Sequence, residues 1–389
     1  MPVTTRPPAV LATLAMTLTL AAGSAHAAAG IETVLGMPPV TNPTNLYSET
    51  GPDKLSPAVA HVPPRVYVPN VKSNEVHVID PATFKVIDRF QVGKNPQHVV
   101  PSWDLTTLWV TNNAEGRTDG TLTPIDPMTG KPGKDVVVDD PYNMYFTPDG
   151  KSAVVVAEAM KRLDFRDPKT MALQGSLSAP KCGGINHGDF SIDGRYLIMT
   201  CEYVGRLVKI DWRARQVLGY LTLPDGGIPQ DIRVSPDGAV FYVADLKAGG
   251  VHLIDGDAFK GVGFIKTGVG THGLYPSRDA TKLYVSNRGF SKIGGKPGIG
   301  KGSVSVIDFA TRNIVATWPI PNAGSPDMGN VSVDGKQLWL SGRYDRVVYV
   351  IDTTSGEVVK TIPVGHEPHG LTVWPQPGRY SLGHTGNMR

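Results

Sequence analysis

Seven places in this sequence hold a histidine or another potential metal ligand at the same point of a recurring phrase. The chain has ten histidines in 389 residues, so random placement would put fewer than one in these positions, yet four hold one. The positions are His98, Asn143, His187, Asp231, His272, Met328 and His369. Neutral imidazoles with a carboxylate or thioether nearby suit copper, zinc or iron. The excess indicates a metal or cofactor site, binding of a small polar or anionic molecule, or a hydrogen-bonding histidine that was copied with each repeat.

The recurring phrase has a regular spacing along the chain. It reads "NPQHVVPSWDLTTLWVTNN" from Asn95, and the steps between successive positions of the set are 45, 44, 44, 41, 56 and 41 residues. In each phrase an apolar run precedes a turn and a second apolar run follows it, which predicts two antiparallel strands. Later runs that end in Ile-Asp or a close variant predict a third strand. A period of about 40 to 45 residues built from such units is typical of β-propeller blades.

We therefore predict an all-β fold, a seven-bladed β-propeller of four-stranded antiparallel blades. The segment from Arg65 supplies the second to fourth strands of a blade, whereas Glu367–Pro375 supplies an inner strand with no full blade after it. One blade is thus expected to be closed by N- and C-terminal strands, which removes an open sheet edge. Eight blades are the alternative, if Ser56–Pro64 pairs as a further strand.

The heads of the inner strands should circle one mouth of the central channel, and so should the corners between the second and third strands. Because strand side chains point into the layers between blades, we expect two or three imidazoles with water rather than all four at one ion. The corners form a predicted second ring of Asn70, Asn112, Glu158, Glu202, Asp245, Asn287, Arg343 and His384. Asn and Asp are common at turns, but Glu158, Glu202 and Asp245 can also orient histidines or act as acid or base.

Three phrases at the ends of predicted second strands resemble the YVTN-repeat β-propeller family (YncE-like). They are "YVPN" at Tyr67–Asn70, "WVTN" at Trp109–Asn112 and "YVSN" at Tyr284–Asn287, and the likeness extends from about Val62 to the end of the chain. In repeat design this family is similar to the cytochrome d1-type haem propeller of nitrite reductases, and more distantly to propeller lactonases. The resemblance implies the fold and leaves the activity open.

The two cysteines, Cys182 and Cys201, are expected to form a disulfide. An oxidising compartment favours that state, and antiparallel pairing of the strands that carry them brings both to the same end. The chain has no CxxCH motif, so it carries no covalent c-type haem.

The N-terminus is predicted to be a signal peptide, residues 1–27. Arg6 precedes an apolar stretch at about residues 9–22, and Ala25-His26-Ala27 fits a cleavage site. An uncleaved anchor is the alternative. A Pro-rich extended lead-in over residues 28–62 and the propeller over residues 63–389 should follow, exported to the periplasm or the extracellular space. No other run is long enough to span a membrane. The net charge of +3 gives no case for nucleic acid binding, and a monomer is expected.

The leading functional hypothesis is an exported binding or accessory protein. It would bind a small molecule, metal or protein at the channel mouth through His98, His187, His272 and His369, with Asp231, Met328 and Asn143. One alternative is an oxidoreductase that uses copper or a non-covalent d1-like haem. Another is a lactonase or lyase with a divalent ion held by Asn143, Asp231, Glu158 and Glu202. The last alternative is a cell-surface interaction platform without a cofactor. Whether the protein is an enzyme stays open.

Overall fold

The computed structural model of the protein describes residues 1–5, 30–290 and 301–389. The signal peptide predicted over residues 1–27 lies outside the described residues, apart from residues 1–5. The chain divides after Gly30, and Ile31–Arg389 is the unit that holds the strands. Among the described residues, no helix is long and apolar enough to cross a membrane.

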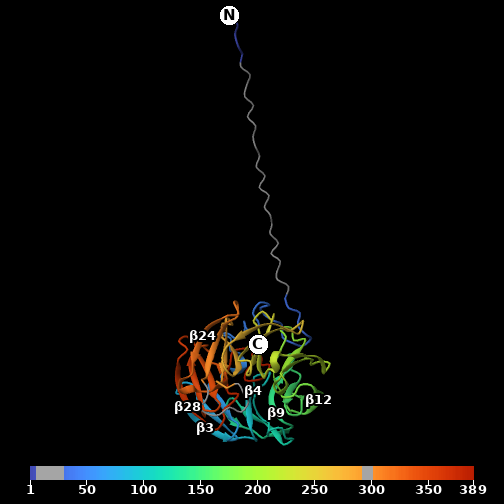
Figure 1. The fold of residues 1–389 in the computed structure, drawn as a ribbon, viewed down its shortest axis with the longest axis vertical. Coiled ribbons are helices and arrows are strands. Elements are labelled where there is room, and N and C mark those ends of the chain that lie inside the picture. Colours follow the sequence, from blue (N-terminus) through green and yellow to red (C-terminus); the bar gives the residue numbers. More distant parts are fainter. Residues whose placement is uncertain (6–29, 291–300) are drawn as a thin grey trace. The chain divides into compact units, whose positions relative to one another are not determined.

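Seven antiparallel sheets follow one another around a common centre (Figure 1). From the C-terminal part, β29 (Thr372–Trp374) pairs with β1 (Arg65–Asn70) and forms the inner edge of the first sheet. The predicted seven-bladed propeller, with one blade closed by both ends of the chain, is confirmed. Residues 56–64 contain the 3-10 helix η1 (Pro57–Val59) and no strand, so the eight-bladed alternative is wrong.

The strands follow the blades in chain order. The first blade continues with β2 (Glu75–Asp80) and β3 (Lys85–Gln91). The second contains β4 (Pro96–Pro101), β5 (Leu108–Asn112), β6 (Gly120–Asp126), β7 (Lys131–Pro132) and β8 (Val136–Val138), the last also paired with β6. The third contains β9 (Pro141–Phe146), β10 (Ala153–Ala157), β11 (Arg162–Arg166) and β12 (Leu173–Ser178). The fourth contains β13 (Ile185–Phe190), β14 (Leu197–Cys201), β15 (Arg206–Asp211) and β16 (Gln216–Thr222).

The fifth blade contains β17 (Pro229–Val234), β18 (Phe241–Asp245), β19 (Gly250–Asp255) and β20 (Lys260–Lys266). The sixth contains β21 (Thr271–Pro276), β22 (Lys282–Asn287), β23 (Ser303–Asp308) and β24 (Ile314–Pro319). The seventh contains β25 (Pro326–Val331), β26 (Gln337–Gly342), β27 (Val347–Asp352) and β28 (Val358–Pro363). Short 3-10 helices occur at η2 (Glu202–Val204), η3 (Pro224–Gly226) and η4 (Pro321–Ala323).

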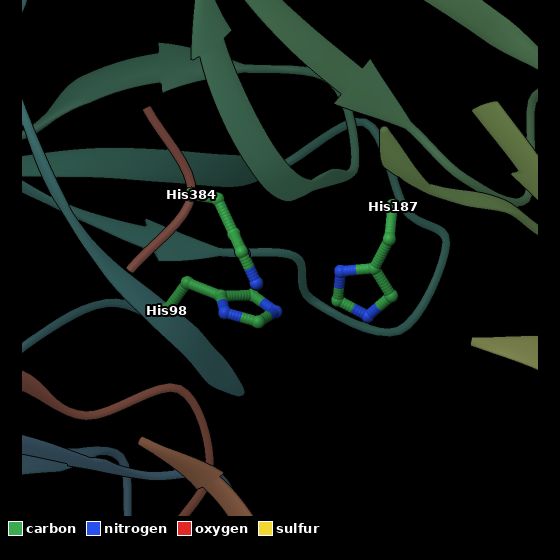
Figure 2. A group of neighbouring side chains, drawn as sticks. All are labelled: His98, His187 and His384. Atoms are coloured by element: carbon green, nitrogen blue, oxygen red, sulfur yellow. The ribbon is translucent and has the colours of Figure 1, made fainter. Parts of the chain in front are cut away.

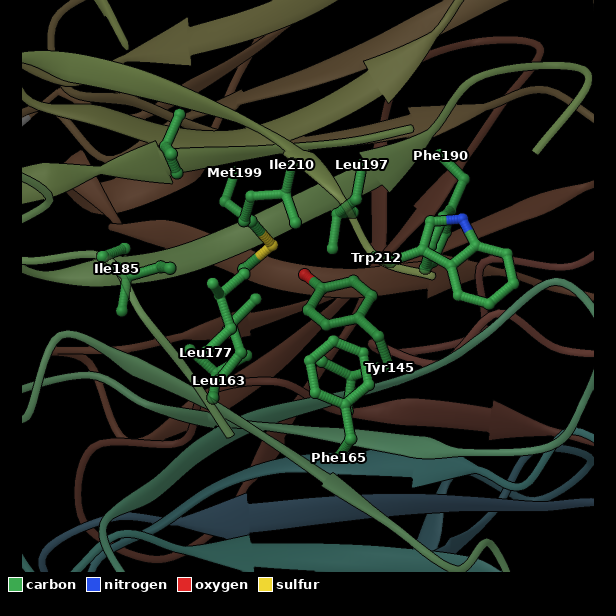
Figure 3. Packing of buried hydrophobic residues seen from close by; sticks show 14 of the residues in the cluster. Tyr145, Leu163, Phe165, Leu177, Ile185, Phe190, Leu197, Met199, Ile210 and Trp212 are labelled. Atoms are coloured by element: carbon green, nitrogen blue, oxygen red, sulfur yellow. The ribbon is translucent and has the colours of Figure 1, made fainter. Parts of the chain in front are cut away.

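A hydrophobic layer lies between neighbouring blades, because apolar residues alternate along the middle strands. Between the third and fourth blades, Phe165 packs with Phe190, Met199 and Trp212 (Figure 3). All four are buried. Full burial of such a side chain contributes about 1.5–3 kcal/mol, so these layers stabilise the ring and hold the inner strands in place.

The last two residues of the WVTN phrase, Thr111 and Asn112, join neighbouring strands by hydrogen bonds. The hydroxyl of Thr111 accepts a hydrogen bond from the backbone N–H of His98 at 3.2 Å and donates to the carbonyl of Tyr142, in the next blade, at 2.9 Å. The side-chain amide of Asn112 donates to the hydroxyl of Thr123, on the third strand, at 2.9 Å. The threonine therefore joins the inner strands of two blades, and the asparagine joins the second strand to the third.

A β-bulge lies at the head of most inner strands. The register with the second strand shifts between Pro96 and His98, Ile185 and Gly188, Pro229 and Ile232, Thr271 and Leu274, and Pro326 and Gly329. A bulge leaves residues unpaired and redirects their side chains. The side chains at these positions can therefore leave the layers between blades and reach the channel, which simple strand alternation would not allow.

The lead-in is anchored to the turns between the first and second strands of several blades. The backbone N–H of Val34 donates to the carbonyl of Asp193 at 3.0 Å, and that of Leu46 donates to Pro236 at 2.7 Å. The hydroxyl of Tyr47 donates to the carbonyl of Val234 at 2.7 Å. The lead-in also contains several turns and η1, so the segment is less extended than its proline content predicts.

The predicted disulfide between Cys182 and Cys201 is confirmed. Cys201 ends β14, and Cys182 lies in the turn before β13, with 4.8 Å between the two Cα atoms. The bond therefore fixes the approach to the inner strand that carries His187.

Candidate functional site

The C-terminal tail enters the space enclosed by the inner strands. The backbone N–H of His384 donates to the carbonyl of Met144 on β9 at 2.8 Å. The last residue, Arg389, is buried, and its guanidinium pairs with Asp189 on β13 at 2.7 Å. His384, which the sequence placed in the second ring of corners, therefore lies inside the channel with no exposed surface.

His384 lies beside His98 and His187, which come from the inner strands of the second and fourth blades (Figure 2). The ring centroid of His384 lies 5.1 Å from that of His98 and 4.9 Å from that of His187. The centroids of His98 and His187 are 5.5 Å apart. One potential ligand nitrogen from each ring lies within 4.8 Å of the others. Since metal–nitrogen bonds are about 2.0–2.1 Å long, small ring movements would bring all three nitrogens onto one ion.

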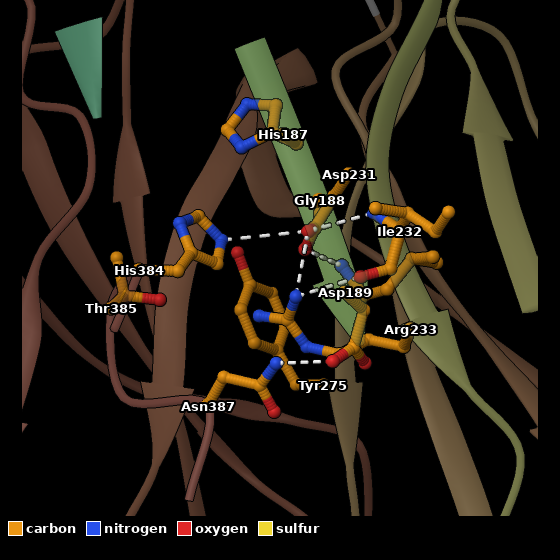
Figure 4. Close-up of polar contacts among 12 residues, drawn as sticks. His187, Gly188, Asp189, Asp231, Ile232, Arg233, Tyr275, His384, Thr385 and Asn387 are labelled. Atoms are coloured by element: carbon orange, nitrogen blue, oxygen red, sulfur yellow. Dashed lines mark hydrogen bonds and ion pairs between the residues drawn. The ribbon is translucent and has the colours of Figure 1, made fainter. Parts of the chain in front are cut away.

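Asn143 and Asp231 orient two of these rings. The amide nitrogen of Asn143 lies 2.9 Å from Nδ1 of His384 and 3.3 Å from Nδ1 of His187. An amide NH₂ group only donates, so the lone pairs of both Nδ1 atoms point to one place. Oδ1 of Asp231 lies 3.4 Å from Nε2 of His384 (Figure 4), as in carboxylate–histidine–metal arrangements. A metal ion bound at either Nδ1 would displace this amide from the ring.

Several ring nitrogens have no hydrogen-bond partner within the described part of the chain. In the channel they are both nitrogens of His98, both nitrogens of His369, Nε2 of His187 and Nε2 of His384. Buried polar atoms are normally paired, so a purely structural network would not leave so many free. Burial, and then the neighbouring His384, hold the pKa of His98 and His187 well below the usual range. The rings are therefore neutral at pH 7, as metal ligation requires.

His272, Asp327 and His369 form a second group close enough for a metal, among the residues that the structure describes. Nδ1 of His272 faces Asp327 at 3.0 Å, and Nε2 of His272 accepts from Arg288 at 2.8 Å. Burial and then Arg288 lower the pKa of His272 to about 4. Met328 also belongs here, because its sulfur lies 3.0 Å from Nδ1 of His272. Since His272 is fully engaged and a guanidinium lies against it, this group suits a metal less well than the first.

A pocket of about 530 Å³ lies next to the histidines. Tyr142 lines it, and the Tyr142 ring also packs edge-on against His98 and His187, with centroids 5.4 and 5.7 Å apart. Tyr142 thus separates the pocket from the first histidine group. Glu158 and Glu202 line the same pocket, and burial followed by the charge of Glu202 raises the pKa of Glu158 well above its usual range. The pocket therefore offers an acid near the histidines.

A family model for YNCE-like β-propellers matches residues 23–377 of the sequence. The chain belongs to the YNCE-like β-propeller family. None of the curated proteins matches the chain significantly.

Solved structures that resemble this YNCE-like propeller share its fold at low sequence identity. The periplasmic gluconolactonase PpgL of Pseudomonas aeruginosa has a TM-score of 0.64 and 20% identity, over 81% of this chain and 99% of that chain. Dihydro-haem d1 dehydrogenase NirN, in complex with DHE, has a TM-score of 0.59 and 17% identity, over 88% of this chain and 79% of that chain. Hydrazine synthase of Kuenenia stuttgartiensis has a TM-score of 0.57 and 19% identity, over 72% of this chain and 91% of that chain. These likenesses establish the architecture and no shared activity.

The predicted second ring does not act as one site in this YNCE-like propeller. Glu158, Glu202 and Arg343 line the pocket. Asp245 instead accepts hydrogen bonds from its own corner and pairs with His252 at 3.1 Å. Asn287, like Asn70 and Asn112, bonds within its own blade. Asn and Asp are common at these corners because their side chains hydrogen-bond the local backbone. The corner residues that stay out of the pocket have this local role.

Three candidate site residues of the YNCE-like propeller were not predicted: Tyr142, Arg288 and Asp327. Each is adjacent in sequence to a predicted position, since Tyr142 precedes Asn143, Asp327 precedes Met328 and Arg288 follows Asn287. Strict alternation along a strand would send such neighbours to the opposite face. Bulges at the strand heads remove that constraint for Tyr142 and Asp327, and Arg288 lies just beyond the end of β22. Adjacency to the repeat positions was the available signal.

Proposed function

We propose that this protein is an exported YNCE-like propeller that binds one transition-metal ion, copper or zinc, through His98, His187 and His384, as a metal-binding or accessory protein. The observation that carries the proposal is the convergence of three buried, neutral imidazoles, several of whose nitrogens lack hydrogen-bond partners. His369 can supply a fourth ligand, because its ring lies 4.7 Å from His98 and neither of its nitrogens has a hydrogen-bond partner among the described residues, with Nε2 3.7 Å from Asp327.

The donor set favours copper and zinc over harder ions. Imidazole nitrogen binds zinc, copper, iron and nickel well, whereas magnesium and calcium prefer oxygen ligands. Both cysteines are in the disulfide, so no thiolate competes for the ion. At equal geometry copper(II) binds nitrogen sites more tightly than the other divalent ions of the first row.

A haem does not fit the residues present. The histidine rings lie 4.7–6.1 Å apart between centroids and contact one another at their edges and faces, which leaves no flat slot between them. Of the five channel histidines, His272 lines the pocket, and its Nε2 already accepts from Arg288. Ligation of a haem iron would require that bond to break, so we assign no role to haem.

The ligand set considered for a divalent-ion lactonase or lyase does not come together. Glu158 and Glu202 line the pocket, whereas Asn143 and Asp231 lie with the histidines. Asp231 is moreover paired with the buried Arg233 at 2.9 Å. We therefore rank this alternative below metal binding by imidazole.

A copper oxidoreductase is the second candidate, and the position of Tyr142 favours it. This side chain lines the pocket and contacts two histidines of the first group. A molecule in the pocket would thus lie one aromatic ring away from the proposed ion. A pocket so close to a metal centre can serve a reaction as well as storage.

The test is the metal content of the intact protein purified after export. We expect one copper or zinc ion per chain by inductively coupled plasma mass spectrometry. His98→Ala and His384→Ala should each lower the occupancy at least tenfold after dialysis, because a lost imidazole leaves an incomplete ligand set. His366→Ala, at an exposed position, is the matched control and should keep the ion. Absence of metal in the wild type, or retention in His384→Ala, contradicts the proposal.

A further inference from the structure

The guanidinium of Arg343 lacks a hydrogen-bond partner in the pocket beside the histidines. Its Nη1 lies 3.6 Å from Asp327 and its Nη2 lies 3.6 Å from Glu367. Both distances exceed those of hydrogen bonds. Nε has no partner among the described residues, and the side chain is 16% exposed. A guanidinium carries five donors in a planar fork, so this one is available to a ligand that enters the pocket.

The other cations of the pocket are already engaged. Arg288 donates to Asp327 at 2.7 Å and to His272 at 2.8 Å. The ammonium group of Lys72 pairs with Glu115 at the rim. Within the described lining of the pocket, Arg343 is therefore the cation whose donors remain for a bound molecule.

Hydrogen-bonding groups beside Arg343 can hold the rest of a polar ligand. Gln97 lines the pocket, and its amide oxygen is buried without a partner in the described chain. Its amide nitrogen donates to Asn113, another lining residue, at 3.3 Å. The oxygen of Gln97 is thus an unpaired acceptor in the wall of the pocket, which a ligand hydroxyl or amine would satisfy.

We propose that the pocket binds a small carboxylate-bearing polar molecule, with Arg343 as the bidentate partner of its carboxylate. A planar carboxylate matches the fork of a guanidinium. The pocket also contains Glu158, Glu202 and Glu367. A doubly charged phosphate would be repelled more strongly by these groups than a singly charged carboxylate. The inference is independent of the proposed metal, since neither Arg343 nor Gln97 belongs to the first histidine group.

The experiment measures ligand binding to metal-free and metal-loaded protein separately. A panel of carboxylates of two to six carbons is tested by thermal shift and calorimetry, each beside its neutral counterpart, for example L-tartrate beside threitol. Inorganic phosphate is included. We expect at least one carboxylate to bind both forms of the protein while its neutral counterpart does not. A failure of metal binding alone leaves this result unchanged, so the two proposals are distinguished.

Variants at Arg343 give the second readout. Arg343→Gln should weaken carboxylate binding by about 30-fold or more, because truncation of a charge-paired partner is costly. Arg343→Lys keeps the charge without the fork and should also weaken binding. Arg346→Gln, at an exposed position on the same hairpin, is the matched control. The proposal is overturned if no carboxylate of the panel binds, if a neutral counterpart or phosphate binds as tightly, or if Arg343→Gln and Arg343→Lys both bind like the wild type.

Discussion

Chemically identical side chains differ in this channel according to their neighbours. His272 has both ring nitrogens engaged, by Asp327 and by Arg288. His98 is equally buried, but neither of its nitrogens has a partner in the described chain. The first is a fixed element of a polar network, whereas the second is open to a ligand. This contrast, rather than the number of histidines, is what points to one metal group and away from the other.

The buried histidines should make the metal-free protein sensitive to mild acid. Burial lowers the pKa of His187 well below 6.5 in the folded state. The unfolded chain therefore takes up a proton as the pH falls through about 6.5, and the folded chain does not. Each such histidine should cost about 1 kcal/mol of unfolding free energy between pH 6.5 and 5.5.

The measurement compares wild type with His187→Gln in urea at pH 7.5, 6.5 and 5.5. The raised pKa values of Glu158 and Glu202 act in the opposite direction, so the difference between the two proteins is more informative than the wild-type trend. The stability gap between the proteins should shift by about 1 kcal/mol, in favour of the variant, between pH 6.5 and 5.5. A gap that does not change with pH would show that His187 is protonated in the folded state as readily as in the unfolded state.

At the scale of elements, a local irregularity repeated in most blades builds the site. The bulge at the head of the inner strand turns its side chain toward the channel, and a hydroxyl on the second strand satisfies the freed backbone. Thr111 does this for His98, and Thr200 does it for His187, with N–H to hydroxyl distances of 3.2 and 3.1 Å. The repeat therefore positions its histidines through backbone geometry.

The disulfide should contribute to the stability of the fourth blade and with it the ring. Cys182 and Cys201 are 19 residues apart, and closing a loop of about this length is worth roughly 3 kcal/mol in the chain-entropy account. The Cys182→Ala, Cys201→Ala double variant should lose about that amount in urea unfolding. Dithiothreitol should destabilise the wild type by a similar amount and leave the double variant unchanged. Equal stability of wild type and double variant would contradict this assignment.

For the whole molecule, the C-terminus has two separable roles. β29 closes the ring by pairing with β1. The tail beyond it enters the channel, buries Leu382 and Met388, and contributes His384. One segment therefore completes both the architecture and the candidate metal site, and the order of its two parts along the chain allows them to be tested apart.

Two truncations separate these roles. A chain ending at Tyr380 keeps β29 and should retain its far-ultraviolet circular dichroism, with a lower melting temperature and no bound metal. A chain ending at Leu371 lacks β29, exposes a sheet edge and should fail to fold cooperatively. Full-length His384→Ala should lose the metal and keep most of the melting temperature. Metal retention by the chain ending at Tyr380 would show that the tail contributes no ligand.

Much of the architecture could be predicted from the sequence, and less of the site. The repeat positions marked His98 and His187, and both lie in the first histidine group. The same reasoning placed Asp245 and His384 in one ring of corners, where only local turn chemistry was visible. Asp245 stays in its own corner, and His384 lies in the channel. The repeat pattern is local, whereas the contacts that distinguish these residues are not.

The sequence alone determined the seven repeats, the closure of the first blade and the disulfide, and it marked the repeat positions of His98 and His187, because these depend on periodicity and on pairing between neighbours in the chain. Only the tertiary structure decided which imidazoles keep free nitrogens. That depends on Asp231, Arg288 and Asn143 from different blades, and on a tail whose path is set by Met144 and Asp189, some two hundred residues earlier. Contacts over such separations arise only when the ring closes and brings all blades to one axis.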